Sequence, residues 1–232
     1  MNGIVAALAA EARALGPSLR RQAPPPSGKL SQLVDGSLLA VSGIGRPAAR
    51  AAAQALVEAR VAALLSFGLA GALDPKLAAG SIILPSELIS DDGARFVTCK
   101  AWRERVSASL GASCAADMGT LLTSARVIAT PLDKAAAFRD TGAAAVDMES
   151  AAVAEVAAAH ALPFIAVRVI VDTAADALPP SVLAATREGR LRVGRLIAGL
   201  AAAPGDIAAL IRLARRYRTA MHCLRVVGTH LA

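Results

Sequence analysis

Two continuous apolar runs constrain the fold more than any other feature of this sequence. They are VAALLSFGLAG at residues 61–71 and LPFIAVRVIVD at residues 162–172. Unbroken apolar runs of this kind are typical of strands whose two faces are both covered. An alanine-rich segment typical of a helix precedes each run, at residues 44–60 and 149–160. The sequence therefore predicts an α/β protein.

The rest of the chain repeats this alternation of short strands and helices. Asp35-Gly36, between two alternating apolar segments, predicts a hairpin turn. Further strands are expected at residues 3–8, 80–89, 119–128 and 143–146. Further helices are expected at residues 9–20, 131–140, 180–200 and from about 207. The pattern predicts one domain over residues 1–232, built as a three-layer α/β/α sandwich around a mixed, mostly parallel sheet.

Composition excludes several other classes of protein. Although 55% of the residues are apolar, charged side chains interrupt every segment before the roughly 18 apolar residues that a membrane-spanning helix needs. The three cysteines form neither a metal-binding spacing nor a disulfide framework. The sequence therefore predicts a cytoplasmic protein without a metal site.

The net charge of +7 is concentrated near the C-terminus, where nine arginines and two acids fall within residues 187–225. Aromatic residues make up only 3% of the chain, so the stacking platform of single-strand nucleic-acid binders is missing, and we expect no nucleic-acid partner. Residues 204–232 predict a basic amphipathic helix. Two interpretations stay open: a helix that covers the domain or a dimer partner, and an interfacial helix attracted to anionic lipid.

Four polar or glycine-rich segments follow predicted strands. They are SGIGR at 42–46, FGLAG at 67–71, VDMES at 146–150 and VDTAAD at 171–176, and Glu11 follows the first strand. Ligands of α/β sheets bind where the carboxyl ends of strands and their loops converge. One pocket is therefore expected to collect all four segments.

Ordinary structural roles are available for most of these polar residues. Asp147 and Ser150 are suited to capping the helix that follows them, which leaves Glu149 without a necessary structural role. Asp172 is in a position to start a turn. Arg168 lies inside a buried strand and needs a partner, which we expect to be an acid such as Asp172 or Glu149.

These segments, in this order, resemble the purine nucleoside phosphorylase and nucleosidase family, and most closely methylthioadenosine/S-adenosylhomocysteine nucleosidase. The resemblance covers most of residues 1–176, and its most specific part is the VDME…PF…VR…D arrangement. The segment TSARVIATPLDKA and the basic C-terminus look like the hopanoid-biosynthesis branch, which is thought to remove adenine from adenosylhopane. The resemblance implies a homo-oligomer, expected to be a dimer, that binds a small nucleoside and needs no cofactor.

The resemblance also implies roles for individual residues. Asp172 would be the acid acting at purine N7, Glu149 would hold the ribose hydroxyls with Met148 packed against the sugar, and Glu11 would activate water. The cleaved bond would be the N-glycosidic bond of an adenine nucleoside, broken through an oxocarbenium-like state. Other expected substrate-binding residues are Gly43, Gly68, Leu69, Val127 and Arg168.

The sequence departs from this family at the expected phosphate site. Relatives that use phosphate carry a serine and an arginine at positions that here are Ser66 and Leu69, and leucine cannot bind an anion. This departure favours water over phosphate as the nucleophile. Phosphorolysis, with phosphate as co-substrate, remains an alternative if Arg13, Arg46 or Arg126 form a rebuilt site. A noncatalytic nucleoside-binding module is a further alternative.

Overall fold

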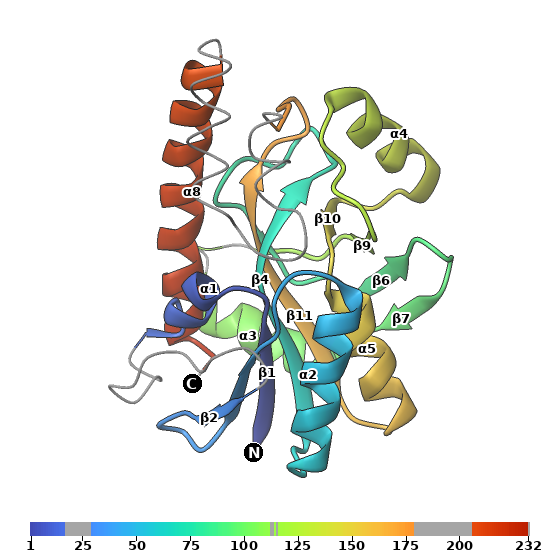
Figure 1. Ribbon diagram of the computed structural model, residues 1–232, viewed down its shortest axis with the longest axis vertical. Coiled ribbons are helices and arrows are strands. Elements are labelled where there is room, and N and C mark those ends of the chain that lie inside the picture. Colours follow the sequence, from blue (N-terminus) through green and yellow to red (C-terminus); the bar gives the residue numbers. More distant parts are fainter. Residues whose placement is uncertain (17–28, 112–113, 115, 179–205, 232) are drawn as a thin grey trace.

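The computed structural model describes residues 1–16, 29–111, 114, 116–178 and 206–231. Its central strand is β4 (Ala63–Ala72), which pairs in parallel with β1 (Asn2–Ala6) and with β11 (Phe164–Asp172). These three strands form the middle of the sheet in Figure 1. The two long apolar runs of the sequence are therefore adjacent buried strands, as predicted.

The described residues contribute eleven strands to one sheet with the main order β2-β3-β1-β4-β10-β9-β6-β7, while β11, β5 and β8 branch from β4. Six strand pairs are parallel and four are antiparallel, which confirms the mixed, mostly parallel sheet. The remaining strands are β2 (Leu30–Gln32), β3 (Leu38–Val41), β5 (Ile82–Ile83), β6 (Glu87–Ser90), β7 (Arg95–Val97), β8 (Ala116–Asp117), β9 (Leu121–Thr123) and β10 (Ala145–Asp147).

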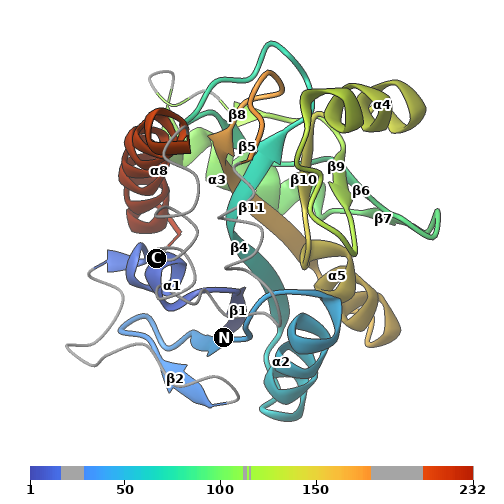
Figure 2. The same ribbon diagram turned by 45° about the horizontal axis from the view of Figure 1, so that its top comes forward.

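Helices cover both faces of the sheet. On one face lie α2 (Arg46–Glu58) and α5 (Ser150–Ala159), which pack against each other. The other face carries α1 (Ala9–Arg13), α3 (Lys100–Leu110) and α8 (Asp206–Thr229). Figure 2 shows α2 and α5 on the opposite side of β4 and β11 from α8 and α1. A further helix, α4 (Pro131–Thr141), packs near β9 and β10 through a small apolar cluster.

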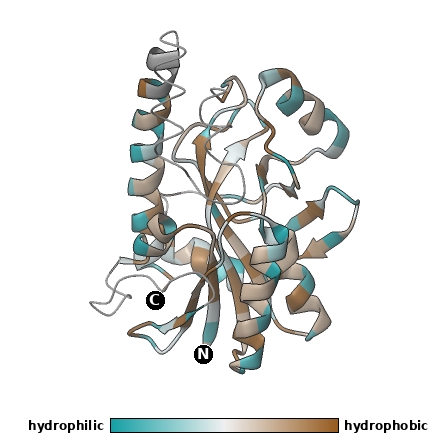
Figure 3. Cartoon of the chain, viewed as in Figure 1, coloured by the Kyte–Doolittle hydropathy of each residue, from teal (hydrophilic) through white to brown (hydrophobic). Residues whose placement is uncertain are grey.

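Alternation along β11 explains why the sheet has an apolar core on each face. Phe164, Ala166 and Ile170 belong to the cluster under α2 and α5, whereas Ile165 and Val167 belong to the cluster under α8 and α3. Successive side chains of a strand point to opposite faces, so a strand covered on both sides is apolar at most positions. In Figure 3 the central strands are brown over much of their length.

Several predicted elements have different limits in the structure. The strand expected at residues 80–89 is divided at Pro85 into β5 and β6, since proline cannot donate to a sheet ladder. The helix expected at 9–20 ends at Arg13, and residues 17–20 lie outside the described part. The prediction omitted β7 and α3 altogether, although Asp92-Gly93 is a turn signal like Asp35-Gly36. The helix expected at 180–200 lies outside the described residues.

The C-terminal helix α8 uses one face to cover the sheet. Its buried residues are Ala220, Met221, Leu224 and Val227, which pack in the cluster that contains β11. Its other side exposes three arginines, spaced three or seven residues apart: Arg215, Arg218 and Arg225. This packing supports the interpretation of α8 as a covering helix. Among the described residues, no helix is long and apolar enough to cross a membrane.

If α8 is an integral part of the fold, truncating its buried face destabilises the protein. Leu224→Ala should lower the free energy of unfolding by about 2–5 kcal/mol, the usual cost of such a truncation in a core. Ile211 lies on the same helix with half of its surface exposed, and Ile211→Ala should change that free energy by less than about 0.5 kcal/mol. Urea denaturation measures both, and equal small effects would show that α8 does not contribute to the core.

Candidate active site

A pocket of about 200 Å³ lies where the predicted segments meet. Its walls come from the loops after β1 and β3, the second half of β4, the loop after β9, and the ends of β10 and β11. Because β10 runs antiparallel to β4, its carboxyl end returns toward the middle of the sheet and brings Glu149 to the pocket. The lining residues are Ala7, Leu8, Glu11, Ile44, Leu69, Ala70, Gly71, Arg126, Val127, Ile128, Val146, Asp147, Met148, Glu149, Val171, Asp172 and Leu178.

The three predicted catalytic acids, Glu11, Glu149 and Asp172, all line this pocket. Each is buried, with an exposed fraction of 5–8%. Of the predicted substrate-binding residues, Met148, Leu69 and Val127 also line it, whereas Gly43, Gly68 and Arg168 do not. The structure therefore brings the acids together and leaves three of the other residues outside the pocket lining.

Glu11 is held at the pocket by two backbone groups. Its Oε2 accepts a hydrogen bond of 2.9 Å from the N–H of Leu8, and its Oε1 accepts one of 2.9 Å from the N–H of Leu69. Burial raises the pKa of the Glu11 carboxyl above its ordinary value, against the opposing effects of the Arg168 charge and these N–H groups. Glu11 is therefore a positioned carboxyl group and not a solvated helix residue.

Gly68 makes room for the Glu11 carboxyl group. A Cβ atom at position 68 would lie 2.6 Å from Oε1 of Glu11 and 3.1 Å from Nη1 of Arg168. The close approach of the carboxylate to the β4 backbone thus requires glycine. Gly43 shapes the neighbouring turn, with a φ of +90° and an N–H that donates to the carbonyl of Ala7 at 2.9 Å.

Glu149 begins helix α5 without capping it through its side chain. Its Oε1 instead accepts a hydrogen bond of 2.8 Å from the N–H of Gly45. Burial and the nearby Asp147 charge raise the pKa of Glu149 to about 7, partly offset by Arg168 and by the Gly45 N–H. Capping falls to Asp147, whose Oδ2 accepts from the N–H of Ser150 at 3.1 Å. Glu149 is thus free to contact a ligand.

A buried network anchored by Arg168 lies beneath the acids. Its Nε donates to Oδ2 of Asp147 at 2.9 Å, and its Nη2 donates to Ser66 Oγ at 2.7 Å and to Ser150 Oγ at 2.9 Å. Thr123 Oγ1 donates to the other Asp147 oxygen at 2.6 Å. The network ties β11, β10, β4, β9 and α5 together below the pocket floor.

Arg168 pairs with an acid, as predicted, but the two acids named as examples are wrong. Neither Asp172 nor Glu149 bonds to it, and Asp147 does. Asp172 lies four residues further along the same strand, so the two positions are separated by about 13 Å of extended chain. Strand spacing alone excludes that pair, and only the return of β10 along β4 reveals the true partner.

Asp172 has a partner that the sequence analysis missed. The Nζ of Lys134, on α4, forms an ion pair with Asp172 Oδ2 and donates to the carbonyls of Thr173 at 2.8 Å and Asp176 at 3.1 Å. Burial nevertheless raises the pKa of Asp172 above its ordinary value, while Lys134 acts in the opposite direction. The sequence shows only a lysine within a predicted helix, and its burial becomes visible in the structure.

Asp176 closes the turn that precedes it. Its Oδ2 accepts from the N–H of Thr173 at 2.8 Å and from Thr173 Oγ1 at 2.7 Å. It also forms an ion pair with Arg216 of α8. This turn is therefore fixed from α4 and from α8 at the point where Asp172 enters the pocket.

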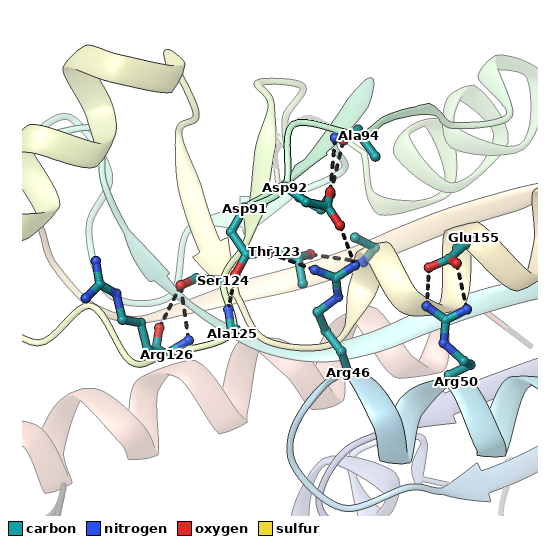
Figure 4. A network of polar contacts seen from close by, with 12 residues as sticks. Arg46, Arg50, Asp91, Asp92, Ala94, Thr123, Ser124, Ala125, Arg126 and Glu155 are labelled. Carbon is teal, nitrogen blue, oxygen red and sulfur yellow. Dashed lines mark hydrogen bonds and ion pairs between the residues drawn. The ribbon is translucent and has the colours of Figure 1, made fainter.

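The loop after β9 supplies Arg126, Val127 and Ile128 to the pocket and is anchored behind by hydrogen bonds. Ser124 Oγ donates to the carbonyl of Arg126 at 2.8 Å, and Asp91 accepts from the N–H of Ala125 at 2.8 Å (Figure 4). This anchoring places aliphatic side chains and an arginine, rather than an aromatic ring, along one pocket wall.

The arginines considered for a phosphate site are differently placed. Arg46 is engaged by Asp91 at 2.7 Å and Asp92 at 3.1 Å, as Figure 4 shows. Arg13 does not line the pocket, so Arg126 is the one basic residue of the described chain that does. Ser66 is buried under Arg168.

Within the described ranges, no group of three or more His, Cys, Asp or Glu side chains has an arrangement suited to a metal ion.

Comparison with known proteins places the chain in a family. A family model described as the phosphorylase superfamily matches residues 4–202, so the chain belongs to the phosphorylase superfamily. It is accordingly an enzyme of a family that cleaves glycosidic bonds of nucleosides. No curated protein matches the chain significantly in sequence.

Solved structures share the fold at low sequence identity. A 5′-methylthioadenosine/S-adenosylhomocysteine nucleosidase from Neisseria meningitidis, in complex with methylthio-immucillin-A, has a TM-score of 0.74 and 19% identity, over 99% of this chain and 97% of that one. The nucleosidase from Colwellia psychrerythraea, in complex with adenine, has a TM-score of 0.65 and 24% identity, over 75% and 83%. Futalosine hydrolase of Helicobacter pylori has a TM-score of 0.69 and 17% identity, over 97% and 96%.

The raised pKa of Glu149 predicts a specific dependence of stability on pH. A carboxyl whose pKa rises from 4.5 to about 7 on folding contributes stability that is complete below the lower value and is lost as the pH rises through 7. Glu149→Gln cannot ionise, so its advantage over the wild type in free energy of unfolding should grow from pH 5 to pH 8. Denaturant titrations at several pH values measure this difference.

The matched control is Glu155→Gln on the same helix. Arg50 lowers the pKa of Glu155, so this substitution should give no such growing advantage. Parallel stability curves for the wild type and Glu149→Gln would contradict the raised pKa.

Proposed function

We propose that this chain hydrolyses the N-glycosidic bond of an adenine nucleoside that carries an apolar 5′-substituent. The observation that carries the proposal is the convergence of Glu11, Glu149 and Asp172, which come from three distant segments, in one buried pocket. Structural neighbours that are nucleosidases or hydrolases, one of them holding adenine, support the same reaction class.

Asp172 is the proposed general acid. Cleavage of a bond between ribose and a purine leaves negative charge on the departing base and positive charge on the sugar, as in other oxocarbenium-like reactions. A proton delivered to a purine ring nitrogen neutralises the base, and general acids of this kind contribute about 10²–10⁴-fold to the rate. Burial raises the pKa of Asp172, which favours the protonated form needed for this step.

Glu149 and Glu11 are assigned to the sugar side. Both carboxyl groups lie near the guanidinium of Arg168, which favours their ionised forms, while burial opposes ionisation. An ionised Glu149 would accept hydrogen bonds from the ribose hydroxyls, with Met148 against the sugar. Glu11 would take a proton from the water that attacks the anomeric carbon. Negative charge at both positions would stabilise the cationic sugar.

The environment of the pocket favours water over phosphate as the nucleophile. A phosphate dianion needs cationic or N–H donors, and Arg126 is the one basic lining residue of the described chain. Leu69 occupies an expected phosphate-binding position, and its N–H donates to Glu11. A negatively charged Glu11 at this point would repel phosphate, whereas it suits a water molecule. Phosphorolysis is therefore the second candidate and would rely on Arg126.

Apolar side chains fill much of the remaining wall, which suits a nonpolar 5′-substituent. Ala7, Leu8, Ile44 and Leu178 are among them. Adenosylhopane is a candidate substrate because of the resemblance to the hopanoid branch, and a 5′-alkylthioadenosine is another.

We also propose a cytoplasmic homodimer. Contact of the arginines of α8 with anionic lipid is a further proposal, suited to a lipid-linked nucleoside.

The first test is release of adenine from a panel of 5′-substituted adenosines. Asp172→Asn should slow release by at least about a hundredfold, because the amide cannot donate the acid's proton. The wild-type rate should be the same with and without phosphate. Release that stops in phosphate-free buffer would establish phosphorolysis, and ligand binding without turnover across the panel would establish a noncatalytic module.

A second test separates the roles of Gly68 and Glu11. Glu11→Ala and Gly68→Ala should each lower kcat, since the first removes the proposed base and the second displaces it through the added methyl group. If Gly68 acts only by making room for Glu11, the double variant should be little slower than Glu11→Ala, as expected for coupled residues. Fully additive losses would give Gly68 a separate contact with the substrate.

A further inference from the structure

Helix α4 directs a charged residue toward the protein interior. Lys134 is its one buried residue, and its side chain has no exposed surface. A helix that packs on a protein usually presents apolar side chains at such a position, and fully buried lysines are rare unless paired. The ammonium group forms an ion pair with Asp172, an acid of the pocket wall. Among the described residues, the ion pair of Arg168 with Asp147 is buried to a similar degree.

The Lys134 ammonium group has three N–H donors, and each has an acceptor. They are Oδ2 of Asp172 and the backbone carbonyls of Thr173 and Asp176. Within the described residues, Lys134 is the one side chain that donates to the Asp172 carboxyl group, and the N–H of Asp172 itself also favours its ionised form. The lysine therefore fixes one oxygen of a carboxyl group that lines the pocket.

Other charges around Asp172 are accounted for. Arg216 of α8 lies near enough to favour its ionised form, but this arginine is also paired with Asp176. The other ionisable residues that line the pocket are Glu11, Asp147, Glu149 and Arg126, and Arg126 is exposed. Lys134 is thus the direct ionic partner of Asp172, and the second cation is shared.

We propose that Lys134 is a positioning residue whose ammonium group fixes one oxygen of Asp172 and stabilises the negative charge that this carboxyl acquires when its proton passes to the purine. The inference rests on the proposed function. In the step, the O–H bond of Asp172 breaks, an N–H bond forms on the purine, and the electrons of the broken glycosidic bond remain on the base. Lys134 keeps its proton throughout.

A buried cation at this point resolves a conflict in the requirements on Asp172. Burial alone would hold the proton firmly, which favours the acid form but makes transfer costly. A fixed positive charge in a site of low dielectric stabilises the carboxylate at the moment it forms and needs no reorganisation. Lys134 therefore links the sequence of α4 to the acidity of Asp172, 38 residues away along the chain.

The alternative is that Lys134 only ties the 173–176 turn to α4. Both roles predict loss of activity on substitution, so a rate alone does not separate them. The separating readout is the pKa of Asp172. It can be followed by the carbon-13 shift of its side-chain carboxyl in protein labelled at aspartate, with the signal assigned by its loss in Asp172→Asn. This titration does not require turnover.

The variants are Lys134→Met and Lys134→Gln, which lack the charge, and Lys134→Arg, which keeps it. Removing an adjacent opposite charge should raise the pKa of Asp172 by at least about one pH unit in the Met and Gln variants. The Gln variant can still donate to a backbone carbonyl, so a loss of turn anchoring alone would affect it less than Met. The Arg variant should retain a pKa close to that of the wild type.

The alkaline limb of the pH profile of kcat/KM for adenine release should move in the same direction, with a rate at the optimum at least about tenfold lower in the Met and Gln variants. An unmoved carboxyl titration in folded Met or Gln variants would overturn the inference. Failure of both neutral variants to fold while the Arg variant folds would assign the lysine to stability and would also overturn it. If the wild type shows no turnover but the variants show the expected titration shifts, the proposed function is refuted. The role of Lys134 in setting the proton affinity of Asp172 would still hold.

Discussion

The buried ion pair between Arg168 and Asp147 is the constraint on which the rest of the site depends. It joins β11 to β10, and its hydrogen bonds extend to Ser66 on β4 and Ser150 on α5. Removing one partner of such a pair typically costs about 3–5 kcal/mol, because the other charge is left buried. The same guanidinium opposes the effect of burial on the pKa of Glu11 and Glu149, so one side chain both joins the strands and favours the ionised forms of the two acids proposed for the sugar side.

Two cations divide the pocket into two electrostatic halves. Arg168 acts on the pair of glutamates, and Lys134, which lies outside the pocket lining, acts on Asp172. Burial raises the pKa of all three acids, and each cation opposes this effect locally. The proposed function requires a proton at one end of the substrate and stabilisation of positive charge at the other, and this division suits both tasks. The proposed function therefore depends on how far each cation offsets the effect of burial on the neighbouring acid.

Much of this could be predicted from the sequence, for identifiable physical reasons. Continuous apolar runs indicate strands that are covered on both faces, and the ends of these strands indicate where polar loops gather. The pocket and the three acids that line it could therefore be predicted. The sequence did not specify which strands run antiparallel. The partner of Arg168 depends on the return of β10 along β4, and the partner of Asp172 depends on where α4 packs. Lys134 looked like any helix lysine because its burial is a tertiary property.

The measurement that tests the central claim most directly is a crystal structure with a hydrolysis-resistant C-nucleoside analogue of adenosine bound. The account predicts that the carboxyl group of Asp172 lies within hydrogen-bond distance of the purine N7 position. It also predicts that Glu149 accepts from the ribose hydroxyls and that Glu11 faces the anomeric carbon from the other side. A nucleoside bound elsewhere, or one whose base and sugar contact none of these carboxyl groups, would contradict it.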